Sequence, residues 1–318
     1  MLENKEVYTL LKNSIIEEIK LPEFKQAHTR VYVKRDDLIH SEISGNKLRK
    51  LKYNLQAMKE KGKRGILTFG GAYSNHLLAT ASICNRDGCG SIGMVRGEEL
   101  NPSSNSTLQR CTELGMKLQF VTRDIYKKKG EAEYLKPLQS AHPSLLIVPE
   151  GGANHEGVLG CAEIMRETVN DFDSVFVAQG TTATSCGILL ALPSKTTLHV
   201  VPVLKGFESL EAMSKITGAT DNWDQLTKQI MVHANYHFGG YGRYTKELLQ
   251  FIQMVYRQTK LPLDPVYTGK AFYALWKEIK QGNLNKKRIL FVHTGGLRTV
   301  KDIEKNTGIN LFSNHYSD

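Results

Sequence analysis

The chain has 318 residues, of which 41% are hydrophobic and 23% charged, with a formal charge of +10. This length favours two associated lobes over a single core, and the composition excludes a largely disordered chain. No run of about 18 apolar residues is present, and residues 1–20 alternate charged and apolar side chains, which excludes a transmembrane helix and a signal peptide. We therefore expect a cytoplasmic protein.

The positive charge and the cysteines limit which macromolecules, cofactors and metals the protein is expected to bind. The basic runs at 59–64 and 126–131 are short, lie beside turn residues and lack interleaved aromatic residues, which is typical of solvated loops. We expect no nucleic acid and no membrane as partners, and the charge fits an anionic substrate or a phosphorylated cofactor. The five cysteines form no CxxC pair, so neither a disulfide framework nor a metal site is expected.

Short β-rich runs alternate along the chain with segments of helical period. Amphipathic helices are predicted from 48 to 58, where Leu48, Leu51, Leu55 and Met58 share one face, and at 245–258 and 269–282. This alternation predicts an α/β protein with mostly parallel sheets and ligands at the carboxyl ends of the strands. The predicted strands lie at 30–35, 65–70, 91–96, 118–122, 145–150, 174–179, 198–204 and 288–294.

The first polar cluster precedes the helix that we expect to begin near Lys47. Ser44, Gly45 and Asn46 have the composition of a loop and an N-cap. An amine among the exposed N–H groups of a helix start is disfavoured in its protonated form, which helps it to act as a nucleophile. Taken alone, however, Lys47 is more simply an exposed helix lysine.

Four further clusters follow predicted strands. Ser74, Asn75 and His76 open a helix after a glycine turn, where N–H groups and short side chains can receive a carboxylate or phosphate. The segment 180–184 lies between an apolar strand and an apolar helix and suits a phosphate, although the lysine of a nucleotide P-loop is missing. Glycine-rich turns occur at 151–154 and 294–296. Capping and tight turns explain each cluster alone, but all can converge on one cleft.

Seven motifs, in this order and spacing, carry a resemblance over nearly the whole chain. They are VKRDDL (33–38), SGNKLRKL (44–51), GGAYSNH (70–76), PEGGAN (149–154), GTTAT (180–184), DPVYTGKA (264–271) and HTGGL (293–297). The sequence resembles the aminocyclopropane-carboxylate (ACC) deaminase and D-cysteine desulfhydrase family of fold type II pyridoxal 5'-phosphate enzymes, related to the tryptophan synthase β subunit. The resemblance implies a two-domain α/β fold with open twisted sheets flanked by helices and the cofactor in the interdomain cleft. We expect a larger cofactor-binding domain from 1–50 and 156–318 and a smaller inserted domain from 51–155.

The resemblance also implies roles for individual residues. Lys47 is expected to hold pyridoxal phosphate as a Schiff base and to accept the α proton of the substrate. Ser74, Asn75 and His76 are expected to receive the substrate carboxylate, with Asn75 also supporting the cofactor ring. Tyr241 and Tyr267 match the two active-site tyrosines, and Ser74 joins them and Lys47 as catalytic residues. The remaining expected cofactor-binding residues are Gly180, Thr181, Thr182, Ala183 and Thr184, which would cradle the phosphate, and Thr268 and Thr294, beside the pyridine nitrogen.

Substrate choice depends on the residue after the second tyrosine. ACC deaminases carry a glutamate there, whereas this chain has Thr268, as D-cysteine desulfhydrases do. A carboxylate beside the pyridine nitrogen keeps it protonated, while a hydroxyl does not and suits eliminations that need less carbanion stabilisation. His76 also fits the desulfhydrase pattern. The phosphate loop has fewer glycines than the usual family loop, and the segments after His76 and around Tyr241 also depart from the family pattern.

Three hypotheses from different classes result. The first is a lyase that converts D-cysteine to pyruvate, sulfide and ammonia, with ACC deaminase, which yields 2-oxobutyrate and ammonia, or another D-amino-acid ammonia-lyase as alternatives. The second is a pyridoxal-phosphate-binding protein without turnover, and the third is a small-ligand-binding module without cofactor. The family resemblance also implies a homodimer, the commonest assembly of soluble proteins. We assign no catalytic role to Asp36 and Asp37, which we expect to cap or to pair with Arg35.

Overall fold

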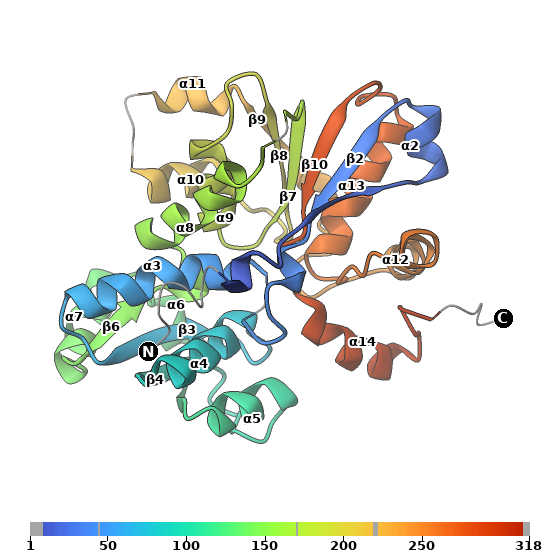
Figure 1. Ribbon diagram of the computed structural model, residues 1–318. Helices are drawn as coiled ribbons and strands as arrows, with labels where there is room; N and C mark the ends of the chain where they lie inside the picture. The colour runs from blue at the N-terminus through green and yellow to red at the C-terminus, as the bar shows by residue number, and fades with distance from the viewer. Residues whose placement is uncertain (1–8, 44, 170, 219–221, 314–318) are drawn as a thin grey trace.

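A computed structural model describes residues 9–43, 45–169, 171–218 and 222–313, so Ser44 lies outside the described residues. The strands form two sheets that stand apart in the molecule, with helix α3 (Asn46–Glu60) between them (Figure 1). None of the helices in the described ranges is long and apolar enough to cross a membrane.

The larger sheet is parallel except at one edge. Its strands, in spatial order, are β1 (Ile16–Ile19), β2 (Arg30–Lys34), β10 (Arg288–Val292), β7 (Ser174–Gln179), β8 (Thr197–Pro202) and β9 (Ile230–Val232). The edge strand β1 pairs antiparallel with β2, and every other pairing is parallel. Parallel pairing requires crossover connections, and here they are helical, as the alternating sequence pattern predicts.

The smaller sheet is wholly parallel. Its spatial order is β5 (Lys117–Val121), β4 (Gly90–Arg96), β3 (Gly65–Gly70) and β6 (Leu145–Val148). All eight strand runs predicted from the sequence are strands in the structure. The two edge strands β1 and β9 were not predicted, because β1 (IEEI) is half charged and β9 has three residues.

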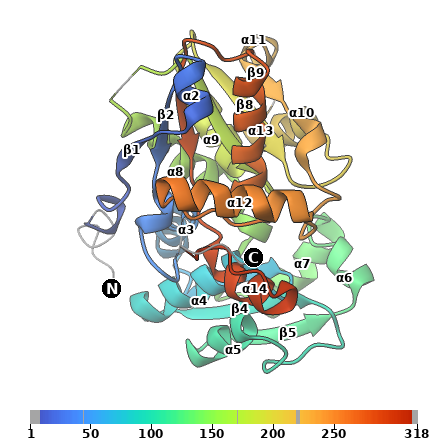
Figure 2. The same cartoon turned by 90° about the vertical axis from the view of Figure 1, so that its right-hand side faces the viewer.

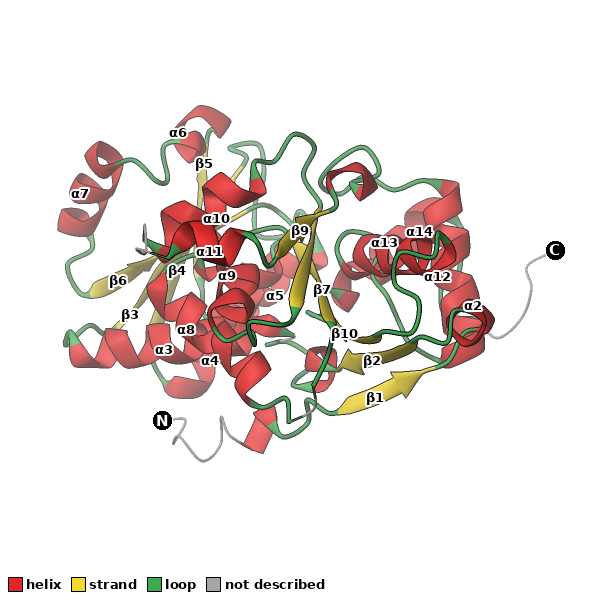
Figure 3. Ribbon diagram, turned by 90° about the horizontal axis from the view of Figure 1, so that it is seen from above, coloured by secondary structure: helices red, strands yellow, loops and turns green. Residues whose placement is uncertain are grey.

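Helices cover both faces of each sheet, as Figures 2 and 3 show for the larger one. Phe176 and Phe291 pack toward α2, α12 and α13, while Val177 and Val292, next in sequence, pack toward α8, α9 and α10. This alternation is the period of two expected of strands buried on both faces. The helices and 3-10 turns are α2 (Pro22–Gln26), η1 (Asp36–Leu38), α3, α4 (Asn75–Asp87), α5 (Ser106–Glu113), α6 (Arg123–Lys127), α7 (Ala132–Ala141), η2 (Glu150–Gly152), α8 (His155–Arg166), α9 (Ala183–Leu190), α10 (Ser209–Thr217), α11 (Trp223–Thr227), η3 (Ala234–Tyr236), α12 (Lys246–Thr259), α13 (Thr268–Lys280), η4 (Leu297–Thr299) and α14 (Val300–Thr307).

A buried ion cluster fixes α3 against the larger sheet. Arg49 is fully buried and donates to both carboxylate oxygens of Asp36 at 2.8 and 2.9 Å and to both of Glu167 at 2.7 and 2.9 Å. Burial acts to raise the pKa of Asp36, but Arg49 outweighs burial and the pKa is lowered. Asp37 instead pairs with Arg35 at 2.7 Å. Neither aspartate lines the pocket described next.

Candidate active site

A pocket of about 520 Å³ lies where strands of both sheets end. Its walls come from the loops that follow β3, β6, β7 and β10 and from the start of α3, which is where ligands are expected in parallel sheets. The expected site residues that line it are Lys47, Ser74, Asn75, His76, Gly180, Thr181, Thr182, Thr184, Tyr241, Tyr267 and Thr294. Ala183 and Thr268 are not among the lining residues.

The loop before α3 brings Lys47 against the end of β10. Gly45 has a φ of 63°, and a Cβ there would lie 1.8 Å from the Thr294 carbonyl oxygen, so only glycine permits this approach. The Asn46 N–H donates to the same carbonyl at 3.3 Å. Asn46 also donates through its side chain to Thr184 at 2.7 Å and accepts from the Lys47 amine at 2.6 Å. Lys47 is therefore held at the junction of three segments.

The Lys47 amine is poised to be neutral. Burial, followed by the charge of Lys50, lowers the pKa of Lys47 to about 7. At neutral pH a large fraction of the amine is therefore unprotonated, as a nucleophile or general base must be.

Lys50 is a second pocket lysine that sequence reasoning missed. Its side chain is 2% exposed, its amine donates to the Thr181 hydroxyl at 3.2 Å, and burial lowers its pKa. Since residues three apart on a helix share a face, its spacing from Lys47 was the available signal.

The loop 180–184 forms a cradle that is packed too tightly for larger side chains at Gly180 and Gly151. It leads into α9, whose first N–H groups have no partner within the helix and face an anion favourably. A Cβ at Gly180 would lie 2.7 Å from the Tyr267 ring, and a Cβ at Gly151 would lie 2.6 Å from the Thr181 side chain. Backbone, hydroxyls and the Lys50 amine thus meet in a space suited to a phosphate.

His76 is neutral and has an unused acceptor. Burial, with Lys47 and Lys50, lowers its pKa to about 3. The Thr68 hydroxyl donates to the Val148 carbonyl at 2.8 Å, so it accepts from His76 Nε2 at 2.9 Å, which places the proton on Nε2. The buried Nδ1 has no hydrogen-bond partner among the described residues. His76 can therefore accept a hydrogen bond from a ligand at Nδ1, but its one ring proton is already donated to Thr68.

Ser74 and Asn75 stand at the start of α4. The Ser74 hydroxyl oxygen caps the helix by accepting from the Leu77 N–H at 3.2 Å, which leaves its own proton free to donate. The free N–H groups of this first turn add to the donors available to a carboxylate.

Two tyrosines, Tyr241 and Tyr267, line the pocket side by side. The rings of Tyr241 and Tyr267 meet edge to face with centroids 5.9 Å apart. Burial raises the pKa of both phenols, so both hydroxyls carry protons at neutral pH. Tyr267 is oriented from behind by the buried Asp264, whose carboxylate accepts from the N–H groups of Val266, Tyr267 and Thr268 at 2.7 to 2.9 Å.

Thr268 is not among the residues that line the pocket. Its side chain is fully buried, and its hydroxyl donates to Asp264 at 2.6 Å. Its sequence position did not reveal this because Asp264, four residues earlier, uses its carboxylate to start α13.

Three charged residues that sequence reasoning did not single out also line the pocket, Arg96, Lys129 and Glu150, which we term the charged rim. Glu150 accepts from the Tyr126 hydroxyl at 2.8 Å and lies 3.4 Å from the Lys129 amine. The Arg96 guanidinium lies 5.9 Å from the centre of the Tyr126 ring. Arg96 ends β4, so a charged residue at a strand's carboxyl end was the signal available.

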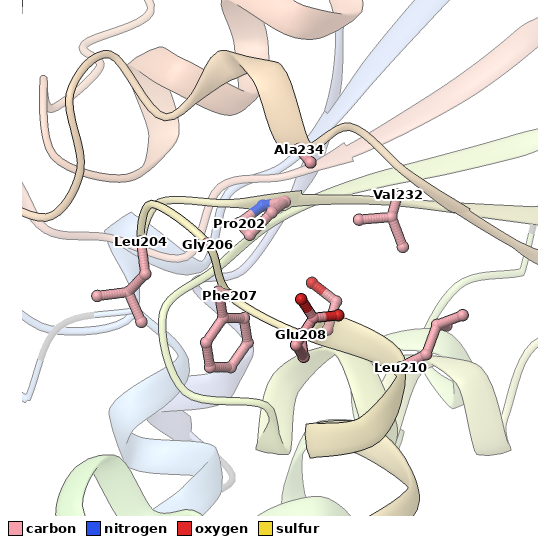
Figure 4. A pocket seen from close by; sticks show the side chains of 9 residues that line it. Pro202, Leu204, Gly206, Phe207, Glu208, Leu210, Val232 and Ala234 are labelled. Carbon is pink, nitrogen blue, oxygen red and sulfur yellow. The ribbon is translucent and has the colours of Figure 1, made fainter.

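A smaller pocket of about 290 Å³ adjoins the first. Figure 4 shows Phe207, Glu208 and Leu210 on one side of it and Pro202, Val232 and Ala234 on the other. Leu204 and Phe207 line both pockets, so the segment after β8 is the partition between them.

These residues fit pyridoxal phosphate. The group needs an amine to bind its aldehyde, a cradle for its phosphate and close approach for a flat ring. Lys47 is an amine of lowered pKa, the loop 180–184 with Lys50 forms the cradle, and Gly295 and Gly296 present backbone without side chains. The unpartnered Nδ1 of His76 is a further polar group that a ligand can satisfy.

Comparison with known proteins identifies relatives. Residues 14–295 match the family described as "Pyridoxal-phosphate dependent enzyme". The chain is 33% identical over 281 residues to a Pyrococcus furiosus protein named "Putative 1-aminocyclopropane-1-carboxylate deaminase", which covers 84% of each. It is 29% identical over 302 residues to a bifunctional D-cysteine desulfhydrase/1-aminocyclopropane-1-carboxylate deaminase of Arabidopsis thaliana, covering 86% of this chain and 74% of that one.

A solved structure agrees with these relatives. A crystal structure described as an ACC deaminase homologue superposes with a TM-score of 0.76 at 28% identity and covers 95% of this chain and 99% of that one. The resemblance predicted from the seven motifs and the fold class that it implied are thereby confirmed.

Proposed function

Because this chain belongs to the family of pyridoxal-phosphate dependent enzymes, we propose that it is a lyase that removes the β substituent of a small amino acid, with D-cysteine as its substrate. The products would be pyruvate, sulfide and ammonia, with one water consumed. Relatives named for D-cysteine desulfhydrase activity support the reaction class.

One observation carries the choice of an elimination. Among the described residues that line the pocket, Glu150 is the sole carboxylate, and it accepts a hydrogen bond from Tyr126 and lies 3.4 Å from the Lys129 amine. The buried Asp264 accepts four hydrogen bonds, three from N–H groups and one from the Thr268 hydroxyl. The one lining carboxylate is thus already paired, which leaves no free carboxylate among the described lining residues to keep a pyridine nitrogen protonated.

The roles of the residues follow from their positions. Lys47 would hold the cofactor through its amine, and Lys47 Nζ would accept the proton from the substrate Cα. Its lowered pKa makes the neutral form available for this transfer. When bound, the cofactor withdraws electrons from Cα and so weakens the Cα–H bond.

The other lining groups orient the substrate. Ser74 and the N–H groups at the start of α4 donate to the substrate carboxylate, which fixes the direction of the Cα–H bond. Tyr241 and Tyr267, both protonated, can donate to the leaving group as it departs. Lys50, Thr181 and the loop 180–184 bind the phosphate.

We further propose the chain's organisation. Residues 1–50 and 156–318 would form the cofactor-binding domain and 51–155 the inserted domain, because the smaller sheet is built from strands between Gly65 and Val148. The cytoplasm would be its compartment, which fits the free cysteines found in the described chain. A homodimer would be its assembly, the commonest one among soluble proteins.

The test is a substrate panel on the purified, cofactor-loaded protein. D-cysteine, L-cysteine, D-serine and ACC are supplied in turn, and sulfide, pyruvate and 2-oxobutyrate are measured. Sulfide and pyruvate in equal amounts from D-cysteine are the expected result. Production of 2-oxobutyrate from ACC at a higher kcat/KM would replace desulfhydration by ACC deamination, the alternative that the relatives' names support. No product from any compound would leave a cofactor-binding protein without turnover.

A further inference from the structure

The loop 237–243, between η3 and α12, carries Tyr241 on an unusual backbone conformation. The φ angles of Phe238 and Gly240 are 50° and 112°, both in the left-handed region. Neither angle belongs to a helix or a strand, and a non-glycine residue seldom adopts one, so neighbouring elements must hold this conformation. The position of Tyr241 in the pocket wall therefore depends on the contacts that its loop makes with the rest of the fold.

Lys270 ties this loop to α13. Its side chain is fully buried, and its amine donates to the carbonyl oxygens of His237 and Gly240 at 2.8 Å each. Gly240 is the residue directly before Tyr241. Burial lowers the pKa of Lys270 to about 8, so the amine is mainly protonated at neutral pH and both hydrogen bonds are charge-assisted.

The start of α13 thus sets the position of both active-site tyrosines. Tyr267 directly precedes this helix, and Asp264 accepts a hydrogen bond from its N–H at 2.7 Å. Lys270, in the first turn of the same helix, holds the loop of Tyr241. The two rings meet edge to face in the pocket wall. Lys270 itself is not among the residues that line the pocket, so its effect on a substrate must pass through the loop.

We propose that Lys270 is a positioning residue that keeps Tyr241 against Tyr267, so that the two phenols act on a substrate as a pair. The inference rests on the proposed function for the chemistry of the tyrosines. Removing the amine is expected to have two separable effects, which are release of the loop and loss of the contribution of Tyr241 to turnover.

Trypsin cleavage of the cofactor-loaded protein after Arg243, an exposed residue of the loop, measures release without any turnover. Lys270→Met should be cleaved there about tenfold faster than the wild type or more, because two charged hydrogen bonds are lost. Cleavage after the exposed Lys127 of α6 is the internal reference and should not change. Lys277→Met is the matched control, since it removes a lysine of the same helix whose amine contacts aromatic rings and not the loop.

Turnover of D-cysteine tests the link to Tyr241. Tyr241→Phe removes a proton donor, for which about a hundredfold loss of kcat is expected. Lys270→Met should lower kcat by about tenfold or more and leave KM and the affinity for pyridoxal phosphate within about twofold of the wild type. Added to Tyr241→Phe, the same change should cost no more than about twofold further, because the phenol through which it acts is already absent.

Each half of the proposal has its own contrary result. Unchanged cleavage after Arg243 in Lys270→Met would overturn the tether. An equal loss of kcat with and without the Tyr241 hydroxyl would reduce Lys270 to a general structural role. If Lys270→Met does not fold, Lys270→Gln, which keeps an uncharged donor on a shorter side chain, is judged by the same criteria. A wild type that forms no product from D-cysteine would contradict the proposed function, and cleavage after Arg243 would still decide the tether.

Discussion

The two sides of helix α3 carry the same sign of charge in opposite surroundings. On one side Arg49 is fully buried and donates to the carboxylates of Asp36 and Glu167. On the other side Lys47 and Lys50 face the pocket, and no carboxylate of the described chain lies within ion-pairing distance of either amine.

The difference separates structural charge from functional charge. A buried cation whose counter-ion is part of the fold keeps its charge at all ordinary pH values and holds segments together. A buried cation without one has a lowered pKa, as both lysines do, and gains a partner only when an anion or an electrophile binds. Five predictions test this distinction, and we take them in order of expected effect.

Lys47→Ala should abolish both catalysis and covalent binding of the cofactor. We expect kcat to fall by roughly 10⁴, the upper range for a lost acid-base group, together with loss of the visible absorbance of the covalently held cofactor. Absorbance spectra and sulfide release measure the two effects, and the urea midpoint of the apo protein should not fall. A variant that retains the absorbance would show that another amine holds the cofactor.

Arg49→Met should lower the free energy of unfolding. It leaves Asp36 buried without its partner, which costs about 3–5 kcal/mol of unfolding free energy. Urea unfolding followed by circular dichroism measures the loss. The double variant with Asp36→Asn should recover part of it, because the unpaired charge is then removed as well. Equal destabilisation of single and double variants would contradict a charge-based explanation.

Lys50→Met should weaken cofactor binding without destabilising the apo protein. Losing a charged hydrogen bond to the phosphate lowers affinity by about ten- to a hundredfold. Equilibrium titration with pyridoxal phosphate gives the affinity, and titration with pyridoxal, which lacks the phosphate, is the control that the substitution should barely change. A marked fall in apo stability would place Lys50 with Arg49 among the structural charges.

The pH dependence of cofactor uptake should report the pKa of Lys47. The pKa is lowered to about 7, so the reactive neutral amine increases as pH rises and the uptake rate should level off above about pH 7. Stopped-flow absorbance between about pH 5.5 and 9 measures it. Because Lys50 contributes to the lowered pKa, Lys50→Met should move the midpoint upward, and an unmoved midpoint would assign the whole shift to burial.

Lys47 also makes the stability of the folded state depend on pH. Its folded pKa lies below the unfolded value, so the unfolded state binds the proton more strongly. Above pH 10.5 the amine is neutral in both states and burying it costs no unfolding free energy for deprotonation. As the pH falls from 10.5 toward 7 the unfolded state gains the proton first, so the folded state loses stability. Apo Lys47→Met should therefore gain stability over the wild type at pH 7 and lose this advantage near pH 10, whereas Arg49 introduces no such change.

The sequence predicted what local patterns determine. Strand runs and the turns that follow them are short-range features, so the fold class was predicted and the polar clusters at Ser74, Gly180 and Thr294 were found. Residues set by long-range packing were missed. Lys50, Arg96 and Glu150 reach one pocket from three different segments, and a lysine, arginine or glutamate in isolation is more often solvated.

Thr268 shows a contact that the motif did not reveal. Its position after Tyr267 suggested a lining hydroxyl, but Asp264 draws that hydroxyl into the start of α13. The Thr268 proton is committed to Asp264, and only the geometry reveals this partner.

The contact between Gly45 and the Thr294 carbonyl has a consequence for how the protein matures. The loop that carries Lys47 is synthesised before β10. The backbone that it contacts belongs to the turn after β10, about 250 residues later in the sequence. Such distant pairings form late because the intervening chain must first be ordered. In a nascent chain Lys47 is therefore an ordinary exposed lysine, and we expect it to acquire its lowered pKa only when β10 enters the larger sheet.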